Sequence, residues 1–125
     1  MLNRVLYTHV LVSDQDEALS YYTDVLGLEK RVDNQAHEGP RFLAVGVEGQ
    51  DLSLVLWPGK PGAAEPAFGR VPAAYTLEVD DCEHAYDQLK ERGVRFVTDV
   101  LEFPWGRIAM FEDPDGNRLQ IRQGL

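Results

Sequence analysis

An internal repeat constrains the fold of this chain more than any other feature. Each half holds the same succession: a strand-like segment, an acidic cap, an amphipathic helix and a glycine that ends it. The two copies run over residues 10–27 and 76–93, and Val12 and Val79 lie 67 positions apart. A repeated supersecondary unit fixes an architecture more firmly than single-residue propensities do. The chain is therefore expected to fold as two similar units.

Local signals place one helix in each unit. Ser13 or Asp14 can cap the first helix, and Asp80 or Asp81 can cap the second. Apolar side chains then recur at the i, i+3, i+4 spacing of a helix with one buried face. Each helix ends at a glycine that can adopt the left-handed conformation, Gly27 in the first and Gly93 in the second.

Three strand-like runs follow each helix, so that each half is predicted to be a βαβββ unit. The expected strands are Leu28–Asp33, Arg41–Val47 and Asp51–Trp57, then Val94–Thr98, Arg107–Phe111 and Asn117–Arg122. A stretch rich in proline and glycine, 58–72, reads as the connector. The prediction is one domain, 1–125, with a first unit over 1–61 and a second over 70–125.

Composition excludes several classes of protein. With 44% hydrophobic and 26% charged residues, the chain is expected to fold around a core. A formal charge of −9 disfavours nucleic acid and anionic membranes as partners, and no apolar run approaches the roughly 20 residues that span a bilayer. A single cysteine, Cys82, rules out an internal disulfide and fits a reducing cytosol, so a cytoplasmic location is expected.

Two motifs carry a family resemblance. The first runs from Val12-Ser13-Asp14 through Tyr21-Tyr22 to Leu26-Gly27, and the second is Phe111-Glu112-Asp113-Pro114-Asp115-Gly116-Asn117. With the tandem βαβββ plan, they resemble the vicinal oxygen chelate superfamily, which includes glyoxalase I, extradiol dioxygenases and bleomycin resistance proteins. The resemblance implies an α+β fold, a curved mixed sheet around a cavity with helices on the convex side, and a homodimer.

Metal-dependent members of that family hold a divalent cation with side chains from the first and last strands of each unit. The resemblance places these four positions at Tyr7, Ser53, Ala74 and Gln120. The set offers no carboxylate and no imidazole, which are the donors that such ions need. The sequence therefore predicts no metal and no other cofactor.

A displaced metal site is the alternative. His9 shares a strand face with Tyr7, and Glu78 shares one with Ala74, because side chains alternate along a strand. His9 could also act as a general base beside Tyr7 or Glu78, although no catalytic residue is assigned. Other candidates have structural interpretations: His37 and His84 as solvated, Cys82 as packing, and Asp113 with Asp115 as turn formers.

The same alternation predicts a ligand pocket on the mixed polar and aromatic face of the strands. Trp105 and Arg107, from the loop before the Arg107–Phe111 strand, would add a stacking surface and a cation. The predicted ligand-binding residues are Tyr7, His9, Ser53, Trp57, Thr76, Trp105, Arg107 and Gln120. A role for Trp57 and Trp105 in the core or in a dimer interface stays open.

Two function classes follow from the resemblance. The leading one is metal-free binding or sequestration of a small aromatic or drug-like molecule, as in bleomycin resistance proteins. The alternative is a metal-dependent lyase, isomerase or dioxygenase whose displaced site uses His9 and Glu78. A third possibility is a protein whose substrate no motif reveals. No motif in the sequence identifies the ligand.

Overall fold

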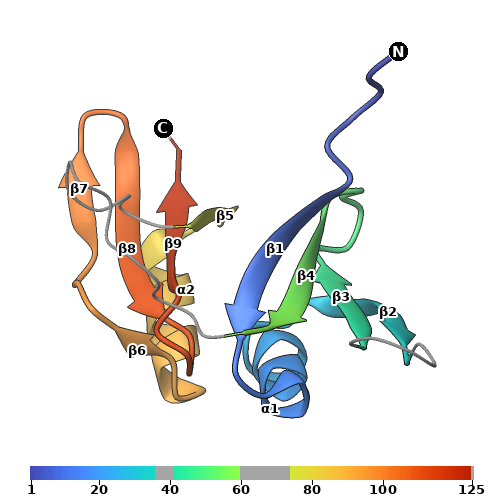
Figure 1. Ribbon diagram of the computed structural model, residues 1–125. Helices are drawn as coiled ribbons and strands as arrows, with labels where there is room; N and C mark the ends of the chain where they lie inside the picture. Colours follow the sequence, from blue (N-terminus) through green and yellow to red (C-terminus); the bar gives the residue numbers. More distant parts are fainter. Residues whose placement is uncertain (36–40, 60–73, 125) are drawn as a thin grey trace, which may run out of the picture. The chain divides into compact units, whose positions relative to one another are not determined.

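The computed structural model describes residues 1–35, 41–59 and 74–124 (Figure 1). The chain divides into two compact units, Met1–Pro61 and Gly62–Leu125, called unit 1 and unit 2 below. The predicted loop around His37 and most of the predicted connector lie outside the described residues. Within the described residues, no helix has the length and apolar content needed to cross a membrane.

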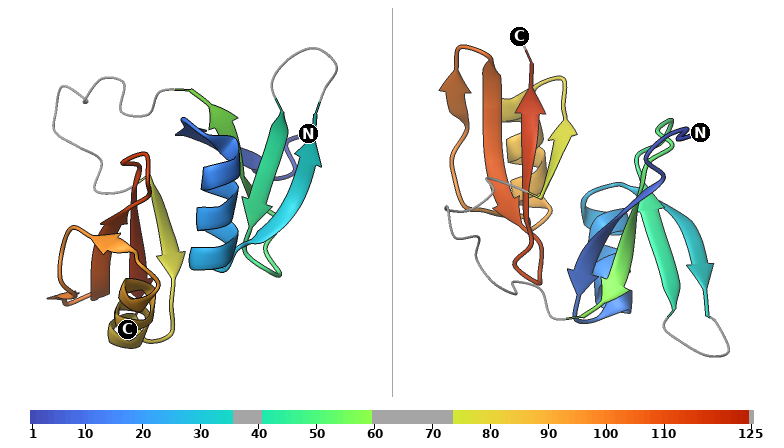
Figure 2. Two further views of the ribbon diagram at one scale, coloured as in Figure 1. Left: turned by 90° about the horizontal axis from the view of Figure 1, so that it is seen from below. Right: turned by 45° about the horizontal axis from the view of Figure 1, so that its top comes forward.

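Unit 1 is a four-stranded mixed sheet with one helical segment. Its sheet has the order β1-β4-β3-β2, in which β1 runs parallel to β4 and the other neighbours are antiparallel. The chain order is β1 (Tyr7–Val12), α1 (Gln15–Ser20), a π-helical turn η1 (Tyr21–Val25), β2 (Glu29–Asn34), β3 (Phe42–Gly46) and β4 (Ser53–Pro58). Figure 2 shows α1 lying along one face of this sheet.

The two faces of the unit 1 sheet differ in burial. The face that α1 covers is aliphatic, with core residues Val10, Val12, Leu43, Val45, Leu54 and Leu56. Ala18 and Tyr22 from the helical segment complete this core. On β1 the alternate side chains, including Tyr7 and His9, are exposed. The second face of the sheet is therefore partly open, as the alternation of the sequence predicts.

Local chemistry explains where the first helix begins and ends. The carboxylate of Asp14 accepts a hydrogen bond from the backbone N–H of Glu17, which identifies Asp14 as the N-cap. The last turn is not α-helical: Leu26 N donates to Tyr21 O, five residues back. Gly27 then takes a φ of +80°, which ends the helical segment as predicted.

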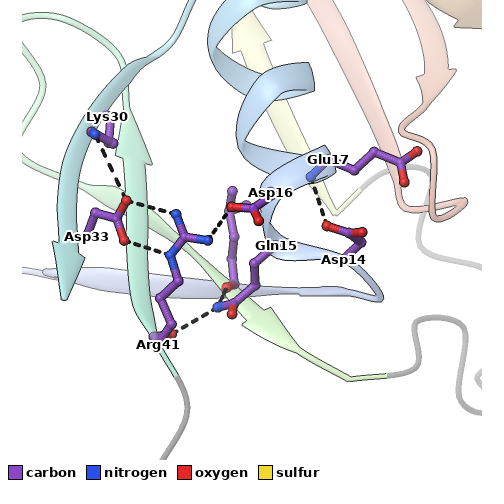
Figure 3. Close-up of polar contacts among 8 residues, drawn as sticks. Asp14, Gln15, Asp16, Glu17, Lys30, Asp33 and Arg41 are labelled. Carbon is purple, nitrogen blue, oxygen red and sulfur yellow. Dashed lines mark hydrogen bonds and ion pairs between the residues drawn. The ribbon is translucent and has the colours of Figure 1, made fainter. Parts of the chain in front are cut away.

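One arginine links the helix of unit 1 to its sheet (Figure 3). Arg41 forms two hydrogen bonds to the carboxylate of Asp33 on β2, of 2.6 and 2.8 Å, and a third of 2.6 Å to Asp16 on α1. Gln15 Nε2 adds bonds to the carbonyls of Arg41 and Leu56. These bonds fix the start of α1 against β3 and β4.

Unit 2 repeats the plan with one extra strand. Its elements are β5 (Tyr75–Glu78), α2 (Cys82–Glu91), β6 (Arg95–Phe96), β7 (Leu101–Phe103), β8 (Gly106–Glu112) and β9 (Arg118–Gln123). The sheet order is β5-β9-β8-β6, with β7 also paired to β8 and with β5 parallel to β9. Asp81 caps α2 by accepting from His84 N, and Gly93 takes a φ of +95° after it.

The β8–β9 turn is built around a buried carboxylate. Asp113 is 1% exposed and accepts hydrogen bonds from the backbone N–H groups of Asp115 and Asn117 and from Asn117 Nδ2. Gly116 supplies the positive φ of +84° that the turn requires. Asp113 therefore has the turn-forming role predicted for it.

The predicted α+β class and a helix-and-sheet plan in each half are confirmed. The strand β7 was not predicted, β6 is shorter than Val94–Thr98, and Arg107 lies within β8 rather than in a loop before the strand. A three-residue strand gives too short a pattern to recognise, which explains the first omission. The division into a single domain with bounds 1–61 and 70–125 stays a prediction.

Candidate functional site

In unit 1, four of the predicted site residues lie on one face of two adjacent strands. Tyr7 and Ser53 are directly paired across β1 and β4, and Trp57 is paired with Leu11, two residues beyond His9. Because paired residues share a face, Tyr7, His9, Ser53 and Trp57 lie together on the face opposite the core of α1. The sheet therefore assembles the half of the predicted pocket wall that belongs to unit 1.

Aromatic contacts order this face. The ring of Tyr7 meets that of Phe42 edge to face, with centroids 5.5 Å apart. The imidazole of His9 meets Trp57 in the same manner at 6.3 Å. Tyr7 is 40% exposed, whereas Ser53 is 4% exposed. The face thus combines accessible rings with one buried hydroxyl.

A cavity of about 400 Å³ lies at the Tyr7 end of this face, a size within the usual range of small-molecule sites. Its lining residues are Leu6, Tyr7, Arg31, Val32, Gly49, Gln50, Asp51 and Ser53. Arg31 is the unexpected member: its Nη1 donates to Ser53 Oγ over 3.1 Å. The site of unit 1 therefore contains a cation that the sequence did not reveal.

In unit 2, Thr76 and Gln120 are paired across β5 and β9 and are joined by a hydrogen bond from Gln120 Nε2 to Thr76 Oγ1 of 2.8 Å. Gln120 Oε1 is buried and has no hydrogen-bond partner among the described residues. The amide therefore retains one acceptor atom for which the described part of the chain supplies no donor.

An aromatic platform extends the same face of unit 2. Phe103 and Trp105 stack in parallel planes, 2° apart, with centroids separated by 4.8 Å. Both are exposed, at 38% and 47%. The Arg122 guanidinium lies 5.3 Å from the Trp105 ring centroid, and its Nη2 donates to the Trp105 carbonyl. The β7–β8 hairpin and β9 therefore present a stacking surface with its own cation.

Arg107 lies on the other face of the unit 2 sheet. It shares a face of β8 with the core residues Ala109 and Phe111, and it pairs with Glu83 of α2 at 3.2 Å and Glu102 at 3.6 Å. The structure therefore places Arg107 on the helix side, apart from Thr76 and Gln120. Arg122, which the sequence analysis did not include in the site, holds the position beside Trp105.

A second cavity, of about 440 Å³, contains none of the predicted site residues. It lies in unit 2 between α2 and the segment around β6, where the rings of Tyr86 and Phe96 are 4.4 Å apart. Lys90 Nζ lies 5.4 Å from the Tyr86 ring centroid. The surface here belongs to the helix side of the sheet.

The four positions that the family uses for a metal do not fit a dication. Tyr7 and Ser53 carry hydroxyls, Gln120 a neutral amide and Ala74 a methyl group. The lone pairs of Ser53 Oγ already face a guanidinium, since Arg31 donates to that oxygen. In the alternative set, His9 lies on β1 of unit 1 and Glu78 on β5 of unit 2. Residues 1–35, 41–59 and 74–124 contain no group of three His, Cys, Asp or Glu side chains positioned to hold an ion.

Sequence reasoning missed Arg31, Phe103 and Arg122. Arg31 sits at an irregularity of the β2–β3 ladder, between Lys30 and Val32, which redirects a side chain in a way that alternation does not predict. Phe103 belongs to the short β7. Arg122 shares the period of Gln120, so strand alternation could have found it.

The chain is similar to known proteins over nearly its whole length. Residues 3–121 match the model of the Glyoxalase/Bleomycin resistance protein/Dioxygenase superfamily. The structure of UcmS2 superposes with a TM-score of 0.84 at 30% identity, over 99% of this chain and 100% of that one. TnmS3, an antibiotic binding protein from Streptomyces sp. CB03234, gives 0.82 at 33% identity, over 99% and 98%.

A named enzyme is also similar. Lactoylglutathione lyase of Neisseria meningitidis serogroup A is 30% identical over 128 residues, which cover 96% of this chain and 90% of that protein. The family match, these relatives and the repeated helix-and-sheet plan agree. The chain therefore belongs to the glyoxalase/bleomycin resistance protein/dioxygenase superfamily.

Proposed function

We propose that this protein binds a small, flat, partly apolar molecule without a metal ion. The observation that carries the proposal is the exposed stack of Phe103 and Trp105. Exposing two large stacked rings to water is unfavourable in free energy, and a ligand that covers them would remove this penalty. Arg122 beside Trp105 adds attraction for an electron-rich ring or a carbonyl group.

The donor chemistry favours binding over metal catalysis. Tyr, Ser, Ala and Gln at the four family positions supply neither charge compensation nor strong donors for Zn²⁺, Mn²⁺ or Fe²⁺. TnmS3, at 33% identity, is described as an antibiotic binding protein, which supports binding of a small molecule by this chain. The lactoylglutathione lyase relatives keep a metal-dependent lyase as the competing function.

Tryptophan emission tests the platform directly. The chain has two tryptophans, so a Trp57→Phe variant reports on Trp105 alone. We expect saturable quenching when this variant is titrated with 1-nitronaphthalene, a flat quencher. Adding Phe103→Ala should weaken binding about fivefold or more, because a stacked aromatic pair contributes about 0.5–1.5 kcal/mol beyond its area. Val97→Ala, at an exposed position of unit 2, is the matched control.

Two results would overturn the proposal. One is quenching that never saturates, or that is equal with and without Phe103. The other is a stoichiometric metal in the purified protein together with turnover that a chelator abolishes, which would favour the lyase, isomerase or dioxygenase.

Homodimerisation and a cytoplasmic location remain predictions. Sedimentation at several protein concentrations tests the first. If Trp105 emission changes on dilution without ligand, the platform is an interface between copies of the chain. Cell fractionation tests the second.

A further inference from the structure

The cavity of unit 1 has a polarity that neither the sequence nor the family suggests. A single arginine makes most of its polar contacts. Arg31 Nη1 donates to the carbonyls of Asp51 and Leu52 as well as to Ser53 Oγ, and Nη2 donates to the Val47 carbonyl over 2.6 Å. These acceptors lie in and beside the β3–β4 hairpin. The guanidinium therefore ties this hairpin to β2.

The backbone makes room for this cation. Gly46 is paired with Ser53, and a Cβ built on it would lie 2.5 Å from Arg31 Cζ. Any side chain there would displace the guanidinium. The turn that follows is closed by Gln50 N donating to Val47 O, with Gly49 at a φ of +85°. The hairpin is thus shaped around Arg31, and Gly49 and Gln50 line the cavity.

Arg31 decides what Ser53 can offer. A hydroxyl has one hydrogen to donate and two lone pairs to accept with. Since Arg31 donates to Ser53 Oγ, the Ser53 hydrogen must point elsewhere. Ser53 is 4% exposed and lines the cavity, and among the described residues its hydroxyl has Arg31 as its one hydrogen-bond partner, while its backbone N–H donates to the Leu6 carbonyl. A buried hydroxyl whose hydrogen has no acceptor lowers the stability of the folded protein, and a ligand that supplies an acceptor removes this penalty.

The charges around the cavity select the kind of acceptor. Arg31 is balanced by Glu29 at 3.1 Å, and Asp51 on the cavity wall is paired with Arg4 at 3.5 Å. Two positive and two negative groups leave no net charge to attract a free anion. Leu6, Val32 and the Tyr7 ring make the remaining wall apolar. The surroundings suit a neutral molecule with one accepting oxygen.

We infer that the unit 1 cavity binds a neutral, carbonyl-bearing aromatic or aliphatic molecule whose oxygen accepts the hydrogen of Ser53 Oγ. At this position the protein donates a hydrogen instead of supplying a lone pair to a cation. The inference goes beyond the proposed function, because it concerns unit 1 and names the group that is recognised. It stands or falls independently of the platform formed by Phe103 and Trp105 in unit 2.

Three ligands of similar size test it by ¹H–¹⁵N NMR. Acetophenone carries the carbonyl, ethylbenzene replaces it with a methylene, and benzoate replaces it with a charged carboxylate. We expect acetophenone to shift the resonances of Gly49, Gln50 and Arg31 Nε–H saturably in the millimolar range, as befits a fragment. Ethylbenzene and benzoate should each bind at least about fivefold more weakly than acetophenone, because each lacks a neutral acceptor.

Matched variants isolate the hydroxyl. Ser53→Ala should weaken acetophenone about fivefold and leave ethylbenzene unchanged, whereas Ser53→Thr, which keeps the hydroxyl, should restore acetophenone. Ser20→Ala, at the exposed end of α1, should change neither. Equal binding of acetophenone and ethylbenzene would overturn the inference, and so would tighter binding of benzoate. A complete lack of acetophenone shifts at concentrations about 20-fold above a millimolar dissociation constant, the usual order for a fragment, would also overturn it.

A cation arm completes the test. Equimolar Mn²⁺ should leave the signals of Tyr7 and Ser53 sharp, and their selective broadening would show a dication site and overturn the inference. The Trp105 indole N–H in the same spectra reports on unit 2. Failure of the proposed function therefore appears as silence at Trp105, and failure of this inference as silence around Ser53.

Discussion

The Arg41 guanidinium grips the Asp33 carboxylate through two parallel hydrogen bonds, from Nε at 2.6 Å and Nη2 at 2.8 Å. The hydrogen bond from Arg41 holds the pKa of Asp33 below its usual value, and the charges of Arg41 and Lys30 add to that shift, while burial opposes it. The same contacts, with Asp33 first and Asp16 second, raise the pKa of Arg41 further above its already high value. These hydrogen bonds link β2 to the residue that precedes β3, and Arg41 also donates to Asp16 at the start of α1.

Arg41→Met should lower the free energy of unfolding at pH 7 by about 1 kcal/mol, since a partly exposed fork is screened by water. A carboxylate whose folded pKa is depressed stabilises the protein above its unfolded pKa and loses that contribution as pH falls through the folded value. The difference between wild type and variant should therefore shrink below about pH 4, near the unfolded value of an aspartate. Urea midpoints at pH 7, 4 and 2.5 measure it.

Arg4→Met is the control for that experiment. Arg4 and Asp51 form an ion pair with both side chains exposed, at 62% and 74%, so its removal should cost less than about 0.5 kcal/mol at any of these pH values. A difference for Arg41→Met that stays constant from pH 7 to pH 2.5 would contradict the assigned linkage to Asp33.

Asp113→Ala should destabilise unit 2 by about 2 kcal/mol, because three donors in the β8–β9 turn lose a buried acceptor together. Asp113→Asn should cost less, since its amide oxygen keeps the two backbone bonds. Thermal unfolding followed by circular dichroism measures both. Asp80→Ala, at an exposed position before α2, should change the midpoint little, and an equal loss in that variant would argue against a special role for Asp113.

The sequence predicted what local chemistry decides. Asp14 and Asp81 cap the helices, Gly27 and Gly93 end them, and the alternation along β1 places Tyr7 and His9 on one face. These features depend on neighbours within a few residues, and the repeat shows the helix signals once in each unit. The family motifs depend on the same short-range order, and the family match confirms the resemblance drawn from them.

The rest of the candidate site depends on contacts between distant residues. Arg31 reaches Ser53 only because the β2–β3 ladder is irregular at that residue and Gly46 leaves space. Arg107 lies on the helix side because it has the same strand parity as the core residue Phe111, so alternation along β8 would have placed it there, and Glu83 pairs with it. An irregularity in a strand ladder, and the space that a glycine on the neighbouring strand leaves, depend on tertiary packing, so strand alternation did not place Arg31 in the site.

Cys82 should be unreactive in the folded protein. It is fully buried, and this burial raises the pKa of its thiol, with Glu83 adding to the effect, although its place in the first turn of α2 would by itself favour the thiolate. Iodoacetamide at pH 8.5 should modify the folded protein at least about 100-fold more slowly than the urea-denatured protein, since only the thiolate of an open state reacts. Comparable rates in the two states would show that the thiol is accessible.

Gly46→Ala should disturb Arg31 before anything else. The added methyl group would lie 2.5 Å from Arg31 Cζ, and a guanidinium at the end of a flexible side chain can move away. Moving it breaks the bonds to the Val47 carbonyl and to Ser53 Oγ, so we expect a loss of about 1–2 kcal/mol by urea unfolding. Arg31→Ala should cost a similar amount through the same lost bonds.

The double variant separates steric pressure on Arg31 from any other effect of the methyl group. Once Arg31→Ala has removed the guanidinium, the space beside Gly46 is open, and Gly46→Ala should then cost at least about 0.5 kcal/mol less than in the wild-type background. That positive coupling follows only if the glycine exists to accommodate this cation. Full additivity of the two substitutions would mean that Gly46 is required by the strand itself, and the hairpin would then have to be held around the cavity by its backbone alone.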